Sequence, residues 1–176
     1  RRIDVAGTAL PSHYDPAFLS TSPDVTALSK GLAGRRTARL CLYGPPGTGK
    51  TAFAHHLARS LDVPLHLKRA SDLQSMWLGQ TEKNIANAFR EAREEGALLL
   101  IDEADSFLQD RNGAQRSWEV SQVNEMLTQM EAFEGIFIAS TNLMDRLDAA
   151  SLRRFDFKVH FGYLTGSQRI ALFRRV

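Results

Sequence analysis

Gly44-Pro45-Pro46-Gly47-Thr48-Gly49-Lys50-Thr51 is the stretch of sequence that decides the fold of this chain. It matches every fixed position of the pattern G-x-x-x-x-G-K-[ST], which builds a phosphate-binding loop between a strand and a helix. The flanking sequence has that context, because Leu40–Tyr43 is an apolar run typical of a strand and Thr51–Leu61 has the pattern of a helix. A Gly- and Pro-rich turn that merely contains Lys-Thr would not need all of these features. The stretch therefore predicts a loop that holds the phosphates of a nucleotide.

The residue types of this loop suit phosphate and magnesium. Glycine lets the backbone turn its N–H groups toward phosphate oxygens, and the following helix adds the positive end of its dipole. We expect Lys50 to reach the β- and γ-phosphates and the Thr51 hydroxyl to bind Mg²⁺, which prefers oxygen ligands. The predicted ATP-binding residues of the loop and the first helical turn are Gly44, Pro45, Pro46, Gly47, Thr48, Gly49, Lys50, Thr51 and Ala52.

Two acids follow a second apolar run. Ala97–Ile101 is unbroken, as expected for a central parallel strand covered on both faces, and Asp102 and Glu103 come directly after it. Open α/β sheets bind their ligands at that edge. We expect Asp102 to bind ATP by holding Mg²⁺ through water, and Glu103 to orient and polarise the attacking water. A second acid beside the metal-binding acid indicates hydrolysis rather than binding alone. Asp105 is interpreted as a helix cap or a solvated acid.

Asn142 follows a further predicted strand, Ile136–Ser140. If this strand lies between the phosphate-loop strand and the acidic strand, the Asn142 amide faces the γ-phosphate and can bond both phosphate and attacking water. Taken alone, an asparagine after a strand is a turn residue. Beside both nucleotide motifs we interpret Asn142 as a catalytic reader of the γ-phosphate.

Arg153 and Arg154 lie just before the last predicted strand, Lys158–Phe161. Arginine is always charged and presents a planar fork to phosphate, and an arginine supplied in trans stabilises the charge of phosphoryl transfer. The other interpretation is a surface pair that forms salt bridges. We favour a catalytic role in trans, without distinguishing the two residues.

Strand and helix patterns alternate along the chain, which indicates parallel βαβ units with helices on both faces of one sheet. The remaining predicted elements are a strand at Leu65–Leu67 and helices at Asp24–Leu32, Glu82–Glu94, Trp118–Met130 and Gly166–Val176. The segment before residue 24 has three prolines and is predicted to be irregular.

Composition excludes several classes of protein. With 43% hydrophobic and 24% charged residues, the chain of 176 residues has the composition of a globular domain rather than a disordered one. A net charge of +2 does not argue for nucleic acid, and no stretch approaches the roughly 18 apolar residues of a membrane span. The single cysteine, Cys41, cannot form an internal disulfide and fits a cytoplasmic location. The start at Arg1 rather than Met suggests a piece of a longer protein.

The chain resembles the AAA-family ATPases of the AAA+ superfamily from about Leu40 to Phe161. The residues that carry the resemblance are the loop Gly44–Thr51, Asp102-Glu103, Ser140-Thr141-Asn142, and Leu147-Asp148 through Arg153-Arg154-Phe155-Asp156. It implies a P-loop NTPase three-layer α/β sandwich whose five parallel strands lie in the order 5-1-4-3-2. It also implies a ring, usually of six subunits, with ATP between neighbours and Arg153 and Arg154 reaching the next subunit's γ-phosphate.

The resemblance also suggests how the chain is divided. Residues 1–23 are expected to pack on the core, 24–165 to form the nucleotide-binding α/β subdomain, and 166–176 to begin a helical lid that is largely missing. Two departures stand out. Many members carry Arg-Pro-Gly-Arg-Phe-Asp where this chain has adjacent arginines, so the identity of the arginine finger stays open. The usual adenine-framing segment is not recognisable, and Tyr14–Leu19 is interpreted as its replacement.

Trp77-Leu78-Gly79 precedes the helix at Glu82–Glu94. In AAA unfoldases an aromatic–aliphatic–Gly triplet at this place lines the central pore, and the triplet here is similar. A rigid aromatic on a glycine-flanked loop would grip an extended polypeptide regardless of its sequence. The other interpretation is that Trp77 is a buried anchor for the helix.

The leading hypothesis is therefore an ATP-driven, ring-forming remodeller or translocase of polypeptides that uses ATP and Mg²⁺. The runner-up is an ATP-controlled assembly switch or adaptor with slow hydrolysis. A small-molecule kinase would share the phosphate loop but would not need the acid pair, the asparagine and the arginines together. We expect the partners to be copies of the chain itself and a polypeptide, and neither nucleic acid nor membrane.

Overall fold

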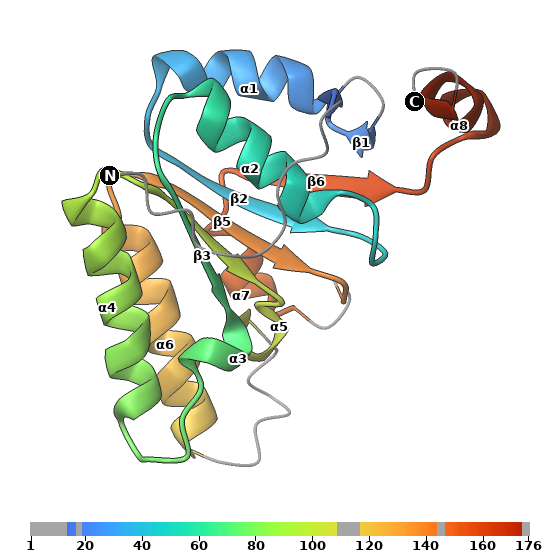
Figure 1. Cartoon of the computed structure of the whole chain (residues 1–176). Helices are drawn as coiled ribbons and strands as arrows, with labels where there is room; N and C mark the ends of the chain where they lie inside the picture. The colour runs from blue at the N-terminus through green and yellow to red at the C-terminus, as the bar shows by residue number, and fades with distance from the viewer. Residues whose placement is uncertain (1–13, 17–18, 109–116, 144–146, 174–176) are drawn as a thin grey trace.

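A computed structural model describes residues 14–16, 19–108, 117–143 and 147–173 as a three-layer α/β structure (Figure 1). One six-stranded sheet forms the middle layer. Its strands are β1 Ser20–Ser22, β2 Ala38–Tyr43, β3 Leu65–Arg69, β4 Leu98–Asp102, β5 Ile136–Thr141 and β6 Phe157–Gly162.

The sheet order is β1-β6-β2-β5-β4-β3. All pairings among β2, β3, β4, β5 and β6 are parallel, and their order is the predicted 5-1-4-3-2, which confirms that part of the fold. β5 lies between β2 and β4, with Tyr43 opposite Thr141 and Ile101 opposite Ala139. The carboxyl ends of the phosphate-loop strand, the acidic strand and the Asn142 strand therefore meet at one edge.

The sheet has one strand more than predicted. Ser20–Ser22 pairs antiparallel with β6, Ser20 opposite Gly162, although the segment before residue 24 was predicted to be irregular. Three small polar residues carry no alternating pattern, so the sequence gives no signal for this strand. It forms because β6 would otherwise leave a row of unpaired backbone N–H and C=O groups along the edge of the sheet.

Helices cover both faces of the sheet. α1 Val25–Gly34 and α2 Lys50–Ser60 pack on one face, and α4 Gln80–Glu94 and α6 Ser117–Ala132 pack on the other (Figure 1). The second face also carries three four-residue helices, and α8 Gly166–Phe173 follows β6. The sequence missed the short helices because one turn is too short to show a helical period. They are α3 Ala70–Leu73, α5 Asp105–Leu108 and α7 Ala149–Leu152.

The central strands are buried on both sides, as their apolar sequence predicts. In β4, Leu99 and Ile101 pack with the α4 and α6 layer, whereas Leu98 and Leu100 pack with the α1 and α2 layer. In α2 the buried apolar residues are Phe53, Ala54, Leu57 and Ala58, whereas Ala52 is only partly buried. The buried run of β4 ends at Asp102, the last residue of the strand, which therefore lies at the carboxyl edge of the sheet with Glu103 directly after it.

Gly44, the first residue of the phosphate loop, is squeezed between two strands. Its N–H donates to the Thr141 carbonyl at 3.3 Å, its φ is +138°, and an added Cβ would lie 2.0 Å from the Phe161 carbonyl oxygen. Only glycine fits this approach without moving β6.

Gly44→Ala is expected to lower the free energy of unfolding by about 2 kcal/mol or more, because the new methyl group meets backbone and the positive φ is strained. Gly31→Ala is the matched control: Gly31 lies in α1 with no atom within 4 Å of an added Cβ, so alanine there should stabilise by about 0.5–1 kcal/mol. Urea unfolding of both variants measures the difference. Equal stabilities would show that Gly44 is not constrained.

Candidate functional site

The phosphate loop bends through two glycines with left-handed backbone. Gly47 has φ +74° and Gly49 has φ +93°, and the Thr48 hydroxyl donates to the Pro45 carbonyl at 2.8 Å inside the loop. Gly49 is the N-cap of α2 and offers no side chain to the first-turn N–H groups. Those N–H groups, together with the helix dipole, form an anion-binding position at the start of α2.

Lys50 is held by oxygens from both sides of the loop. Its side chain is buried, with 8% of the residue exposed. Its Nζ donates to the Gly44 carbonyl at 2.7 Å, the Pro45 carbonyl at 2.9 Å and Asn142 Oδ1 at 2.8 Å. Burial lowers the pKa of Lys50, and the charges of Asp102 and Asp105 oppose that shift. The ammonium is therefore fixed at the carboxyl edge of the sheet with neutral partners that phosphate oxygens can replace.

Asp102 is oriented by three donors. The Thr51 hydroxyl donates to its Oδ2 at 2.8 Å, the Ser140 hydroxyl donates to its Oδ1, and the Glu103 N–H donates to the same Oδ1 at 3.0 Å. The donors come from α2, β5 and the residue after β4. The structure thus brings together Thr51 and Asp102, the two residues that the sequence selects as metal ligands.

Thr51 and Asp102 fit a magnesium ion. A hydroxyl and a carboxylate are oxygen ligands of the kind that Mg²⁺ prefers, and their oxygens already point at each other. The described residues contain no group of three His, Cys, Asp or Glu side chains able to hold a metal. The remaining ligands of a magnesium ion here would therefore come from nucleotide phosphates and water, as is usual for this ion.

Glu103 has a strained backbone and an exposed side chain. Its φ is +57°, which is uncommon for a residue other than glycine, and such strain clusters at functional sites. The side chain is exposed, and its carboxylate forms no hydrogen bond or ion pair within the described part of the chain. It follows the oriented Asp102 directly and is accessible to a water molecule.

Asn142 lies where the strand order places it. It follows β5, is exposed, and its amide oxygen accepts the bond from Lys50. The conditional prediction about its strand is confirmed by the sheet order, in which β5 separates β2 from β4.

The two adjacent arginines have different surroundings. Arg154 donates to the Ala150 carbonyl at 2.9 Å and forms an ion pair with Glu131 of α6. Arg153, at the end of α7, is exposed, and its guanidinium has no hydrogen-bond or ion-pair partner among the residues that the structure describes. Neither guanidinium is hydrogen-bonded to the phosphate loop of its own chain.

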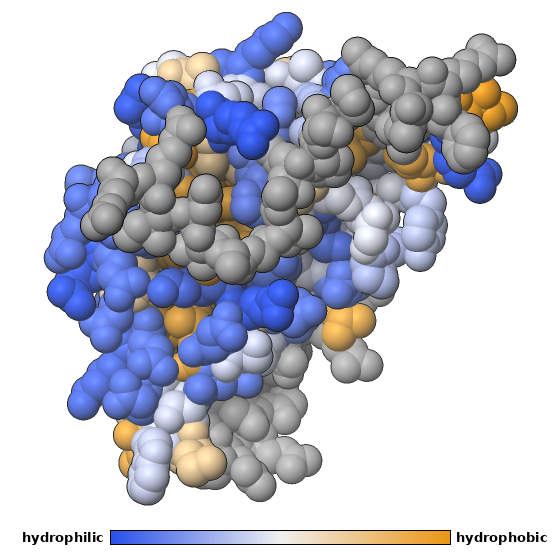
Figure 2. Space-filling model, in the orientation of Figure 1, coloured by the Kyte–Doolittle hydropathy of each residue, from blue (hydrophilic) through white to orange (hydrophobic). Residues whose placement is uncertain are grey.

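Trp77 is exposed, so the interpretation as a buried anchor is wrong. It shows 74% of its surface, Met76 shows 92% and Leu78 shows 88%. Gly79, at φ +75°, then turns the chain into α4 as its N-cap. Hydrophobic colour gathers at this end of the molecule below α4 (Figure 2). Three consecutive apolar side chains in solvent indicate a contact surface.

The described part of Tyr14–Leu19 lies along the phosphate loop and α2. Leu19 Cδ2 is 3.1 Å from the position of a Cβ at Gly49, and the ring centroids of Tyr14 and His56 are 5.1 Å apart. Asp105, interpreted from sequence as a cap or a solvated acid, is instead half-buried and accepts a hydrogen bond from the Thr141 hydroxyl. The signal available in the sequence is the position of Asp105 three residues after Asp102, at the start of α5.

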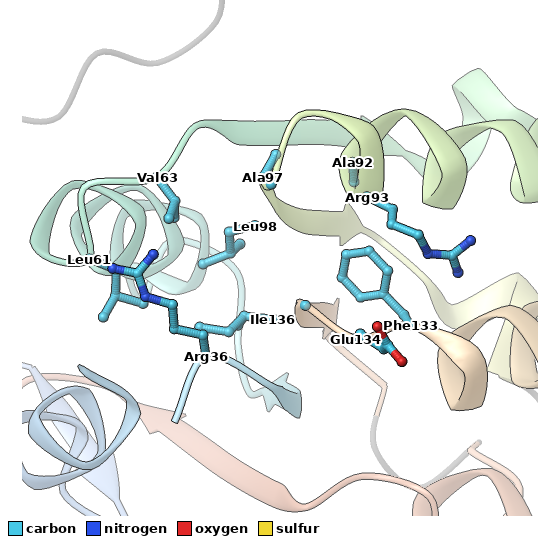
Figure 3. A pocket seen from close by; sticks show the side chains of 12 residues that line it. Arg36, Leu61, Val63, Ala92, Arg93, Ala97, Leu98, Phe133, Glu134 and Ile136 are labelled. Atoms are coloured by element: carbon cyan, nitrogen blue, oxygen red, sulfur yellow. The ribbon is translucent and has the colours of Figure 1, made fainter. Parts of the chain in front are cut away.

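A cavity of about 320 Å³ lies elsewhere, at the amino ends of β4 and β5 (Figure 3). Val63, Ala97, Leu98 and Ile136 line it, with Arg36 and Arg93 on opposite sides. Ligands of open parallel sheets bind at the carboxyl ends of strands, so this cavity is separate from the candidate site.

Comparisons with known proteins agree with the geometry. The family model "ATPase family associated with various cellular activities (AAA)" matches residues 40–163. The chain is 34% identical over 140 residues to Protein SUPPRESSOR OF K(+) TRANSPORT GROWTH DEFECT 1 of Arabidopsis thaliana, covering 76% of this chain and 32% of that protein. It is 36% identical over 136 residues to the ATP-dependent zinc metalloprotease YME1L1 of Mus musculus, covering 73% and 19%.

A third relative is Vacuolar protein sorting-associated protein 4 of Dictyostelium discoideum, 33% identical over 141 residues, with coverage of 77% of this chain and 32% of the relative. The chain therefore spans about a third or less of the length of these curated relatives. Among the described residues, none of the helices has the length and apolar character needed to cross a membrane.

Proposed function

Because the chain belongs to the AAA family of ATPases, we propose that Lys50, Thr51 and Asp102 bind Mg-ATP and that Glu103 activates the water that hydrolyses it. The observation that carries this proposal is the 2.8 Å contact between the Thr51 hydroxyl and the Asp102 carboxylate. That contact joins the end of the phosphate loop to the acidic strand, where a magnesium ion could bind to both.

Each residue of the site has a separate role in the proposed hydrolysis. The loop amides and Lys50 bind the β- and γ-phosphates, and Thr51 and Asp102 would hold the magnesium ion. When bound, the metal would neutralise charge on the phosphates. Glu103 takes a proton from water as the water oxygen bonds to the γ-phosphorus, and the bond to the β–γ bridging oxygen breaks to release ADP. The Asn142 amide orients this water and the γ-phosphate.

We further propose that a second copy of the chain completes the site in a ring, for which the family resemblance implies six subunits. Arg153 supports this part of the proposal, because a free, exposed guanidinium at the end of α7 can reach a neighbour's γ-phosphate. Arg154 is engaged with Glu131 and Ala150, so we assign it the bracing of α7 against α6.

The exposed Met76-Trp77-Leu78 tip supports a polypeptide as the substrate that ATP turnover moves or remodels. Its side chains have the apolar, sequence-tolerant character that an extended chain would need. The alternative function is an ATP-controlled assembly switch, in which the same tip would bind one folded partner. A cytoplasmic location stays a prediction.

Glu103→Gln is expected to lower kcat for ATP hydrolysis by about 10²-fold or more while Mg-ATP still binds, because the amide cannot accept the proton from water. Steady-state phosphate release and calorimetry on the intact protein measure the two properties. Glu94→Gln, an exposed position on α4, is the matched control and should leave kcat unchanged. Normal turnover by Glu103→Gln would remove the assigned role.

Arg153→Ala is expected to lower kcat by about 10³-fold, because a trans arginine stabilises the transferring phosphoryl group. Mixing Arg153→Ala protomers with Lys50→Ala protomers should restore measurable turnover, since the hybrid interface combines an intact Lys50 with an intact Arg153. Arg154→Ala should mainly lower thermal stability, through loss of its bonds to α6 and α7. Mixed rings that form but stay inactive would contradict action in trans.

Trp77→Ala is expected to weaken binding of an unfolded polypeptide by about 30-fold, the effect of removing an aromatic hot spot. Anisotropy of fluorescein-labelled casein, added to the ATP-bound Glu103→Gln protein, measures the affinity. Trp77→Phe keeps an aromatic ring and should retain most of the binding, and Tyr163→Ala removes another exposed aromatic side chain outside the tip. Unchanged casein affinity in Trp77→Ala would favour the assembly switch.

A further inference from the structure

A second acid is tied to the end of β5, beside the one that fits magnesium. Asp105 is the first residue of α5, and its Oδ1 accepts a hydrogen bond from the Thr141 hydroxyl. Thr141 is the last residue of β5 and is 1% exposed. Its hydroxyl oxygen also accepts from the Leu143 N–H at 2.9 Å. One hydroxyl therefore links α5 to the turn that follows β5.

That turn contains Asn142. The residue lies between Thr141 and Leu143, the two residues joined by the hydroxyl, and its own amide oxygen accepts from Lys50 Nζ at 2.8 Å. The Thr141 hydroxyl donates its proton to Asp105 and accepts from the Leu143 N–H with a lone pair, so the two bonds together hold its oxygen between α5 and the turn.

The two residues at the end of β5 bond acids on opposite faces of the sheet. Successive side chains of a strand alternate between faces. Ser140 donates to Asp102 on the α2 side, where Thr51 also reaches it, and Thr141 donates to Asp105 on the side of α5. β5 is thus bound to the acidic segment on both faces immediately before Asn142.

Asp105 is a charged residue in a partly buried position, which is costly without hydrogen bonds. It is only partly exposed, and it is followed by Phe107 and Leu108, which are fully buried in the core on this face. Burying part of a carboxylate costs free energy unless it is well hydrogen-bonded, and a bond to a charged acceptor is stronger than one to a neutral group. The negative charge of Asp105 also acts on Lys50. Burial lowers the pKa of Lys50, and the charges of Asp102 and Asp105 oppose that shift.

We propose that Asp105, acting through the Thr141 hydroxyl, is a positioning residue that holds the Asn142 amide at the phosphate loop for hydrolysis. The inference rests on the proposed function, in which Asn142 orients the γ-phosphate and the attacking water. Asp105 itself touches neither. Its loss should therefore slow turnover while Mg-ATP binding, which depends on the loop, Lys50 and Thr51, remains.

The test compares kcat and Mg-ATP affinity in the intact protein. Asp105→Ala and Thr141→Val are each expected to lower kcat by about 10-fold or more, with the ATP dissociation constant within about threefold of the original. Thr141→Val is isosteric and tests the same bond if Asp105→Ala does not fold. Thr141→Ser keeps the hydroxyl and should retain kcat within about twofold. Asp62→Asn and Thr128→Val, exposed and remote from the site, are matched controls that should change nothing.

Double variants separate positioning from general destabilisation. Asn142→Ala alone should lower kcat, and adding Asp105→Ala should lower it no further, because no amide remains to be positioned. If Asn142→Ala alone leaves kcat unchanged, the role of Asn142 in the proposed function fails and this inference fails with it. If Asn142→Ala slows turnover but Asp105→Ala and Thr141→Val do not, or if their effects multiply with that of Asn142→Ala, the inference is overturned and the proposed function stands.

Discussion

The buried ammonium of Lys50 is the interaction on which the rest of the site depends. A cation removed from water is costly unless its donors are satisfied, and here two loop carbonyls and the Asn142 amide satisfy them. The loop can aim the Gly44 carbonyl inward only because its backbone adopts a φ that glycine permits, between β5 and β6. The carboxylates that balance the charge, Asp102 and Asp105, act on it without a hydrogen bond. The Lys50 ammonium is thus held in a fixed position, and the oxygens of an anionic ligand can replace its present hydrogen-bond acceptors.

Much of the fold could be predicted because its signals are local. The glycines and lysine of the phosphate loop, and the apolar run before Asp102, each specify a conformation within a few residues. The order of the five parallel strands came from resemblance and is confirmed by their pairing. β1 could not be predicted, because it exists only through the free edge of β6, some 140 residues away. The roles within the site stay proposals, although the structure brings Lys50, Thr51, Asp102 and Asn142 together.

Other features depend on contacts that a sequence cannot display. Arg153 and Arg154 are the same residue type at adjacent positions, and they are distinguished by the contacts of Arg154 with Glu131 on α6 and with the Ala150 carbonyl. A tryptophan before a helix is compatible with burial or exposure, and in this structure Trp77 is exposed. Asp105 resembles a solvated acid until β5 places Thr141 beside it. For the arginines and Asp105, the missing information is which distant strand or helix becomes a neighbour.

The pairing of β1 with β6 brings early and late parts of the chain to one border of the sheet. Ser20 lies opposite Gly162, and the Gln168 side chain donates to the Leu19 carbonyl at 3.5 Å. The phosphate loop and the acids of the site lie in the sequence between these two contacting segments. A folded unit whose first and last strands are neighbours can be inserted into a longer polypeptide without disrupting its sheet. Such insertion is tolerated by domains whose ends lie close together.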